Sequence, residues 1–204
     1  MQGLPAHQRV HVFVDGQNLY HAAKEAFNYT YPNYDIHALS NAVCRTQGWT
    51  PTRISFYTGV PSARDDARWN TFWGKKFIGM GRRGINIFHR ELRYREQTVR
   101  IGTTRVTGIV GQEKGIDVRI AVDIIRGALE NRYDMALVFS QDQDLSEVAD
   151  EIRLIARQNK RPIAMASALP VGPGTKNDRG VNHTQWIKID RATYDACLDP
   201  NDYR

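Results

Sequence analysis

The chain has 204 residues, of which 41% are hydrophobic and 25% are charged, and its formal net charge is +6. This composition is typical of a globular protein with one well-buried core. No apolar run reaches the roughly 18 residues that cross a bilayer, which argues against an integral membrane protein. The positive charge makes a polyanionic partner plausible, nucleic acid first, but it does not locate a site.

The two cysteines, Cys44 and Cys197, have neither a metal-ligand spacing nor a disulfide framework. The first ten residues, MQGLPAHQRV, contain no basic stretch followed by an apolar core, so we expect no secretion signal. Together these features predict reduced thiols in a cytoplasmic protein.

The first half of the chain predicts a buried strand, two helices, a second strand and a third helix, in that order. Their expected ranges are 10–14, 19–26, 36–47, 52–58 and 63–79. In the last of these helices Trp69, Phe72 and Trp73 recur at helical spacing. Such a stripe packs against a core more often than it stacks on nucleic-acid bases, so we interpret it as core.

From about residue 85 to 110 the pattern changes to alternation, which predicts strands joined by turns at Arg95–Gln97 and at Gly102. Five further elements and a Gly/Pro-rich loop follow. They are a helix at 115–131, a strand at 135–140, a helix at 145–159, a strand at 162–168, the loop at 172–182 and a last strand at 186–189.

Short apolar strands that alternate with helices indicate a mainly parallel sheet covered by helices on both faces. The alternating segment would be a small β-hairpin insertion in this α/β fold. We find no internal repeat, long linker or low-complexity tail, so we expect residues 1–204 to form one domain.

Acidic residues follow two of the predicted strands. Strand 10–14 runs into Asp15, and strand 135–140 runs into the stretch that contains Asp142 and Asp144. Sites in open α/β sheets form beyond the carboxyl ends of the strands. If the two strands are neighbours, the three carboxylates face one small volume.

A further carboxylate, Asp117, shares a helix face with the apolar residues three, four, seven and eleven positions later. A carboxylate that points toward the core is costly unless it meets a cation or a cavity. By contrast, Arg119, Asp123 and Arg126 follow the same spacing on another face. We interpret that face as a solvated, ion-paired surface.

Carboxylates that converge without matching basic neighbours suggest a divalent cation. Oxygen ligands suit Mg²⁺ or Mn²⁺, which could activate a water for attack on a phosphodiester. Simpler roles remain open. Asp144 and Glu147 have capping-box spacing, and Asp15 and Asn18 could cap the next helix. Asp142 is the hardest to explain as a cap, because a second carboxylate adds repulsion.

The stretches VFVDGQNLY, KGIDVRIAVDII and YDMALVFSQDQDL, in this order, resemble the NYN domain, a branch of the PIN-like nuclease superfamily, and in particular its bacterial LabA-type proteins. The similarity extends over about residues 10–190. It implies a three-layer α/β sandwich with metal-dependent ribonuclease activity.

By matching position, the resemblance assigns catalytic roles to five residues, four of them as metal ligands. The ligands are Asp15, Asp117, Asp142 and Asp144, and Asn18 is the partner of the first. Two other positions complicate the match. Asp123 corresponds to an acidic position in many such proteins, and Gln141 stands where they often have glycine.

Basic residues concentrate around the alternating segment and beside Asp117. They could contact the phosphates of a nucleic acid, or they could be a solvated strand edge. Lys114 and Arg119 are the best placed to hold a phosphate, and the loop at 172–182 could be a mobile flap. The expected contacts are Lys114, Arg119, Arg82, Arg83, Arg90, Arg93, Arg95 and Lys176. We expect His183 to form hydrogen bonds within its loop rather than to act as a catalytic base.

Three functions compete. The first is a Mg²⁺- or Mn²⁺-dependent ribonuclease, with DNA as a further possible substrate because no residue identifies a reader of the 2′-hydroxyl. The second is a non-catalytic RNA-binding or regulatory module on the same fold. The third is a phosphatase or nucleotide hydrolase, against which the missing phosphate-binding motifs argue. A homo-oligomer is compatible with all three.

Overall fold

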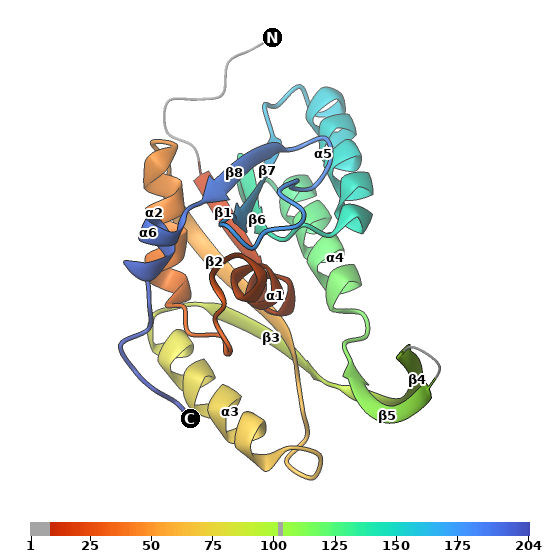
Figure 1. The fold of residues 1–204 in the computed structure, drawn as a ribbon. Coiled ribbons are helices and arrows are strands. Elements are labelled where there is room, and N and C mark those ends of the chain that lie inside the picture. Colours follow the sequence, from red (N-terminus) through yellow and green to blue (C-terminus); the bar gives the residue numbers. More distant parts are fainter. Residues whose placement is uncertain (1–8, 102–103) are drawn as a thin grey trace.

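The computed structural model describes residues 9–101 and 104–204. Strands and helices alternate along most of the chain, as the sequence predicts (Figure 1). The strands are β1 (Arg9–Asp15), β2 (Thr50–Val60), β3 (Asn86–Glu91), β4 (Arg93–Ile101), β5 (Thr104–Gln112), β6 (Met135–Phe139), β7 (Ala164–Pro170) and β8 (Gln185–Ile189). The helices are α1 (Gly16–Phe27), α2 (Ile36–Thr46), α3 (Ala67–Arg82), α4 (Ile116–Leu129), α5 (Ser146–Gln158) and α6 (Arg191–Asp195), and a 3₁₀ turn, η1, spans Gln143–Leu145.

Six strands form one parallel sheet in the order β3-β2-β1-β6-β7-β8. The strand β1 lies in the middle and pairs with β2 and β6, so that Val14 lies opposite Phe139. The two strands that the sequence shows running into carboxylates are therefore neighbours. Their carboxyl ends lie at one edge of the sheet, which confirms the premise of the predicted site.

Two apolar clusters, one on each face of the sheet, form the core. Val10, Val12 and Val14 point to the face covered by α1, α2, α3 and α6 (Figure 1). Phe13, between them, points to the face covered by α4 and α5. Because side chains alternate along a strand, a single apolar strand serves both layers. The expected three-layer α/β sandwich is confirmed.

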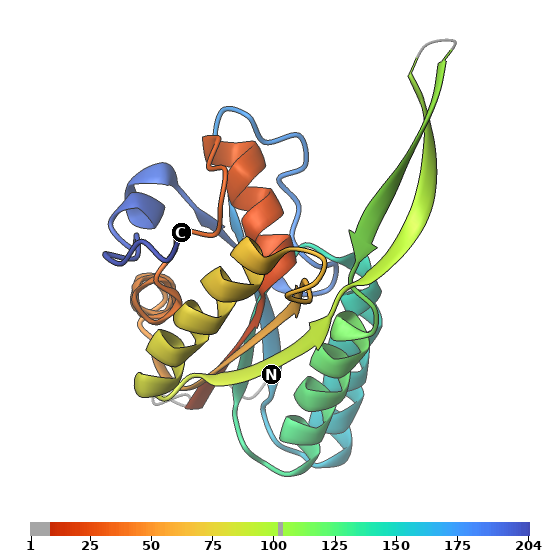
Figure 2. The same ribbon diagram turned by 90° about the horizontal axis from the view of Figure 1, so that it is seen from below.

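The strands β4 and β5 form an antiparallel hairpin that projects from the body of the molecule (Figure 2). The expected turn at Arg95–Gln97 is wrong, because β4 continues through these residues in register with β5. The chain changes direction earlier, at Leu92, where β3 leaves the main sheet. Polar alternation cannot distinguish a turn from an exposed strand with two solvated faces. The expected turn at Gly102 lies outside the described residues.

The aromatic stripe of α3 packs as predicted. Phe72 and Trp73 are buried in the core, and Trp69 packs partly buried against it. The helix begins at residue 67 rather than 63, because the Asp66 side chain accepts a hydrogen bond from the Trp69 N–H and caps it there. No helix within the described ranges is long and apolar enough to cross a membrane. Cys44 and Cys197 are free, buried thiols.

Candidate active site

Asp15 is the last residue of β1 and the N-cap residue of α1. Its Oδ1 accepts a hydrogen bond from the Asn18 N–H at 3.0 Å, so the helix cap considered from the sequence is real. Capping leaves the carboxylate only 8% exposed. Burial, with smaller contributions from Asp142 and Asp117, raises the pKa of Asp15 to about 6. A carboxyl group held in this way binds a proton, or another cation, more readily than an exposed aspartate does.

Three of the predicted carboxylates line one cavity of about 390 Å³ at the carboxyl edge of the sheet. Asp15 comes from the end of β1, Asp117 from the first turn of α4, and Asp142 from the loop after β6. The structure thus brings Asp15 together with two side chains that lie more than a hundred residues later in the sequence. The same cavity is also lined by Gln17, Asn18, His21, Glu113, Lys114, Gly115 and Ile116.

Asn18 joins the two strand ends. Its Oδ1 accepts a hydrogen bond from the Gln141 N–H at 3.0 Å, across 123 positions of sequence. The side chain of Gln141, which stands where relatives often have glycine, points to the 172–182 loop and donates to the carbonyls of Asn177 and Arg179. Gln141 therefore holds that loop against the strand end. It is not one of the residues that line the carboxylate cavity.

Asp144 is the predicted ligand that the structure does not bring to the others. It is exposed and does not line the cavity. Nor does it cap α5, whose first turn has no side-chain cap. The cap in this loop is Asp142, whose Oδ1 accepts from the Asp144 N–H at 3.0 Å. Asp142 therefore lines the cavity and Asp144, two residues later in the short 3₁₀ turn, does not, which sequence spacing alone does not reveal.

Glu113 is a fourth carboxylate of the cavity, and sequence reasoning missed it. It accepts hydrogen bonds from the Gly59 N–H and, at 3.4 Å, from Thr58 Oγ1, both at the end of β2. Burial raises the pKa of Glu113 to about 7, with Asp15 and Asp117 adding to the effect. Its position in the sequence could have indicated its role, because Glu113 stands directly before the K-G-x-D motif that begins at Lys114.

The donor set suits a hard cation, since carboxylate oxygens face one cavity and two of them have raised pKa values. Among residues 9–101 and 104–204, however, no group of three His, Cys, Asp or Glu side chains is arranged to hold a metal ion. The two observations agree for Mg²⁺, which usually keeps several waters and binds through one or two carboxylates. The residues present fit such an ion.

The predicted phosphate contacts are spread over several places. Lys114 lines the cavity, and Arg90 donates to the Lys114 carbonyl at 3.3 Å. Arg83 forms an ion pair with Asp35 at the far end of α3. Arg93 and Arg95 are exposed on β4 of the projecting hairpin.

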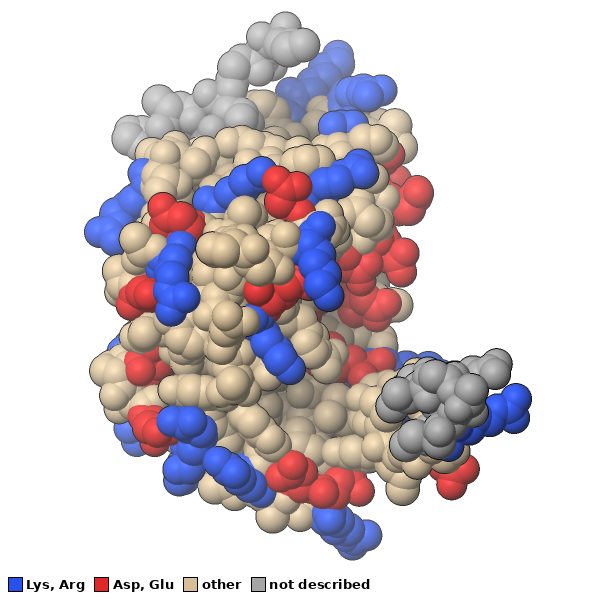
Figure 3. Space-filling view, in the orientation of Figure 1, with Lys and Arg blue, Asp and Glu red and all other residues tan. Residues whose placement is uncertain are grey.

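Arg82 and Lys176 lie apart from the cavity, Arg82 at the end of α3 and Lys176 in the 172–182 loop, where its N–H donates to Glu25 Oε1. Basic and acidic side chains are mixed over the described part of the face that carries α1 (Figure 3). The net charge therefore forms no continuous basic stripe on this face.

Arg119 and Asp123 belong together, away from the carboxylate cavity. Arg119 Nε donates to Asp123 Oδ2 at 2.8 Å, and the Tyr57 hydroxyl donates to the same oxygen at 3.0 Å. The expected ion pairing of Asp123 is confirmed. His183 is also as expected, since its Nδ1 is 2.9 Å from Asp150 Oδ2 and it lies in a loop.

Comparison with known proteins gives one family and one informative structure. The model of the NYN domain matches residues 9–170. A crystal structure of a protein of unknown function from Vibrio parahaemolyticus is similar, with a TM-score of 0.53, 19% identity, and coverage of 94% of this chain and 98% of that one. At this identity the likeness supports the fold alone.

A crystal structure of Acinetobacter baumannii MurG matches weakly, with a TM-score of 0.28 and 12% identity over 88% of this chain and 45% of that one. This likeness is too weak to carry an argument. No curated protein matches the chain.

Proposed function

Because this chain belongs to the NYN domain family of the PIN-like nuclease superfamily, we propose that it is a ribonuclease that hydrolyses phosphodiester bonds with a divalent metal ion at the carboxylate cavity. The observation that carries the proposal is the meeting of Asp15, Asp117 and Asp142 in one cavity at the carboxyl edge of the sheet. Three separate elements deliver these side chains. A structural role for any one of them does not explain why all three face the same space.

Asp15, Asp117 and Asp142 would hold Mg²⁺ or Mn²⁺, directly or through water. When bound, such an ion lowers the pKa of a coordinated water and neutralises charge on a phosphate oxygen. Glu113 adds a group whose pKa of about 7 allows it to accept a proton near neutral pH. Its hydrogen bonds to the end of β2 hold it beside the other carboxylates.

The start of α4 supports phosphate binding at the same place. Gly115, in the left-handed conformation at φ +73°, precedes this helix of 14 residues, and no side chain caps its first turn. The free N–H groups and the positive end of the helix dipole favour an anion there. Lys114, exposed at the same cavity, adds a full positive charge. A phosphodiester could therefore approach carboxylates that would otherwise repel it.

The alternative is a non-catalytic RNA-binding or regulatory module on the same fold. Its support is that Asp144 lies outside the cavity and that no three His, Cys, Asp or Glu side chains among the described residues are arranged to hold a metal ion together. On this hypothesis the carboxylates are helix caps and the RNA contacts lie elsewhere. The two hypotheses differ in one measurable property, metal-dependent turnover.

The deciding experiment measures cleavage of end-labelled RNA, and of DNA of the same sequence, with Mn²⁺, with Mg²⁺ and with EDTA. We expect cleavage of RNA with metal only. Asp15→Asn and Asp142→Asn should each reduce the rate by more than about a hundredfold, beyond the usual loss from an outer-shell partner. Asp178→Asn, which changes an exposed aspartate paired with Lys188, should cleave at the wild-type rate.

Asp144→Asn distinguishes the site that the cavity defines, which excludes Asp144, from the site that the sequence motif predicts, which includes it. The cavity geometry predicts a loss of less than about tenfold for this variant, smaller than for Asp142→Asn. Equal cleavage by wild type and Asp142→Asn would contradict the proposal. RNA binding without turnover under any of the metals would favour the regulatory module.

A further inference from the structure

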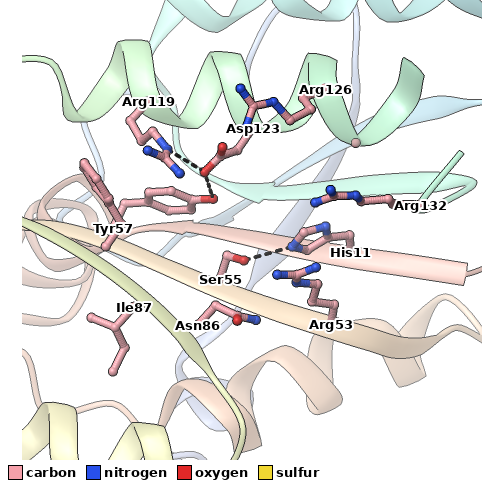
Figure 4. Close-up of a pocket in the computed structure, with 12 residues that line it drawn as sticks. His11, Arg53, Ser55, Tyr57, Asn86, Ile87, Arg119, Asp123, Arg126 and Arg132 are labelled. Atoms are coloured by element: carbon pink, nitrogen blue, oxygen red, sulfur yellow. Dashed lines mark hydrogen bonds and ion pairs between the residues drawn. The ribbon is translucent and has the colours of Figure 1, made fainter. Parts of the chain in front are cut away.

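A second cavity lies on the face of the sheet beneath α4, away from the carboxylates. Its volume is about 260 Å³, and its walls come from β1, β2, β3, α4 and the turn after α4 (Figure 4). Its charged lining consists of Arg53, Arg119, Arg126, Arg132 and a single acid, Asp123. We call this cavity the arginine pocket.

The arginine pocket is separate from the proposed active site. His11 lines the pocket, and Asp15 lies four residues later on the same face of β1. At about 3.3 Å per residue in a parallel strand, the two positions are about 13 Å apart. No residue lines both cavities. A ligand in the arginine pocket therefore does not depend on the metal chemistry proposed above.

The acid in the pocket is already neutralised. Asp123 accepts from Arg119 at 2.8 Å and from the Tyr57 hydroxyl at 3.0 Å, and Arg119 also lies over the Phe88 ring, 4.6 Å from its centroid. This network builds one wall of the pocket. It leaves no carboxylate in the lining to balance the other arginines.

Two of the remaining arginines have no partner among the described residues. Arg53 on β2 and Arg126 on α4 form no side-chain hydrogen bond or ion pair there, while Arg132 pairs with Glu130 outside the pocket. Figure 4 shows Arg53 and Arg132 near the His11 ring, with Arg126 on the helix above. Guanidinium groups that gather around a hollow whose single acid is already paired form a site suited to an anion with several oxygens.

The buried histidine gives an independent observation. His11 is only 5% exposed, and its Nε2 is 2.9 Å from Ser55 Oγ. Its Nδ1 is one of two buried side-chain polar atoms without a hydrogen-bond partner among the described residues, the other being Ser40 Oγ. An unsatisfied buried polar atom requires an explanation. A ligand that accepts a hydrogen bond from this ring would provide one.

We propose that the arginine pocket binds a small phosphate-bearing anion, held by Arg53 and Arg126 and completed by the ring of His11. Arginine forms paired hydrogen bonds with phosphate oxygens, which an ammonium group cannot match. The pocket is smaller than the roughly 300–1,000 Å³ of sites for drug-sized ligands. It therefore suits one or two phosphate groups rather than a whole nucleotide. The phosphates could belong to a free anion or to the backbone of a nucleic acid.

The test uses pyrophosphate as the probe, in calorimetric titrations at low ionic strength with the full-length protein in EDTA. Loss of two charge-assisted contacts in the double variant Arg53→Gln/Arg126→Gln should weaken binding at least about tenfold. Arg153→Gln, which removes an arginine on α5 that pairs with Asp150, should bind within about twofold of wild type.

Two further measurements complete the test. In nuclear magnetic resonance spectra the ring signals of His11 should move on addition of pyrophosphate, while those of exposed His183 should not. Displacement of pyrophosphate by an oligoribonucleotide would assign the phosphate to an RNA backbone, and simultaneous binding would assign it to a free anion. No binding by wild type, unmoved His11 signals, or an equal loss in Arg153→Gln would overturn the proposal.

Discussion

At the scale of single residues, this protein combines capping and site chemistry in the same side chains. Asp15 caps α1 and Asp142 caps the turn after β6, yet both line the carboxylate cavity. The alternatives that sequence patterns present as competitors therefore coexist. In each cap the hydrogen bond uses Oδ1 of the carboxylate, which leaves Oδ2 free to face a ligand. The pKa of Asp15 is raised because burial destabilises its ionised form by more than the hydrogen bond of the cap stabilises it.

The first prediction concerns stability. The pKa of Asp15 is about 6 in the folded chain against 3.8 for an ordinary aspartate, so the folded state binds this proton more tightly. Ionised Asp15 therefore costs stability, and the cost grows as pH rises from about 4 to above 6, toward about 3 kcal/mol. Asn is an equally good cap. Asp15→Asn should be more stable than wild type at about pH 7 but not at about pH 4.

Urea unfolding in EDTA at the two pH values measures this difference. A variant that is less stable than wild type at the higher pH would show that the charge of Asp15 is compensated in the folded chain. With Mn²⁺ added, wild type should gain stability through ligand binding and Asp15→Asn should gain less.

The second prediction concerns the pH dependence of RNA cleavage. Asp15 and Glu113 have pKa values of about 6 and about 7, both raised first by burial. Protonation removes the negative charge that would attract the metal ion, so the rate should fall as pH decreases from about 8 to about 5. Glu113→Gln should move the midpoint of this profile to lower pH, because the carboxyl group with the higher pKa no longer titrates. Rates measured at a fixed Mn²⁺ concentration below saturation test this, and an unchanged midpoint would exclude Glu113 from the titration.

At the scale of elements, the site depends on contacts between strand ends that are distant in sequence. Asn18, in the first turn of α1, holds the loop after β6 through the Gln141 N–H. Glu113, just after the hairpin, is held by the end of β2. The hairpin interrupts the alternation of strands and helices, but it delivers Glu113 and Lys114 to the cavity. Its function in the fold is thus partly to lead the chain back to the active-site edge.

The third prediction tests the link between α1 and β6. Asn18→Ala removes the acceptor of a partly buried N–H, which should cost about 1–2 kcal/mol of stability. Cleavage should fall more than stability predicts, because the loop that carries Asp142 loses its anchor. Asn41→Ala is the matched control, since half-buried Asn41 bonds only within α2. Chemical unfolding and cleavage rates of both variants separate the effects, and an equal outcome for both would refute the link.

At the scale of the whole molecule, the segment that follows α6 is tied to the body by a buried charge. Lys76 on α3 is 1% exposed and donates to the Tyr34 carbonyl at 2.8 Å and to Asp199 at 2.9 Å. Burial lowers the pKa of Lys76, and Asp199 opposes this effect. The ion pair thus joins α3 to the end of the chain. A charge of this kind specifies one arrangement of the segments around it.

The fourth prediction follows from this pair. Lys76→Met leaves Asp199 without its cation and should lower the free energy of unfolding by about 3 kcal/mol. The double variant Lys76→Met/Asp199→Leu, which leaves no unpaired charge, should recover part of the loss. Chemical unfolding of wild type and both variants gives the coupling. A double variant less stable than Lys76→Met would show that the pair is not the source of the effect.

Hydrophobic periodicity and the order of the residues are enough to predict the α/β class, the parallel sheet and the carboxylates at the ends of β1 and β6. The folded structure was needed to show that Glu113 joins Asp15 in one cavity while Asp144 lies outside it, and that Arg53 and Arg126 share a pocket with His11. These contacts depend on the direction in which each side chain points once the chain has folded. Periodicity shows which residues share a face of one element, but the angle at which a turn presents a side chain, and the approach of elements distant in sequence, arise only when the elements pack.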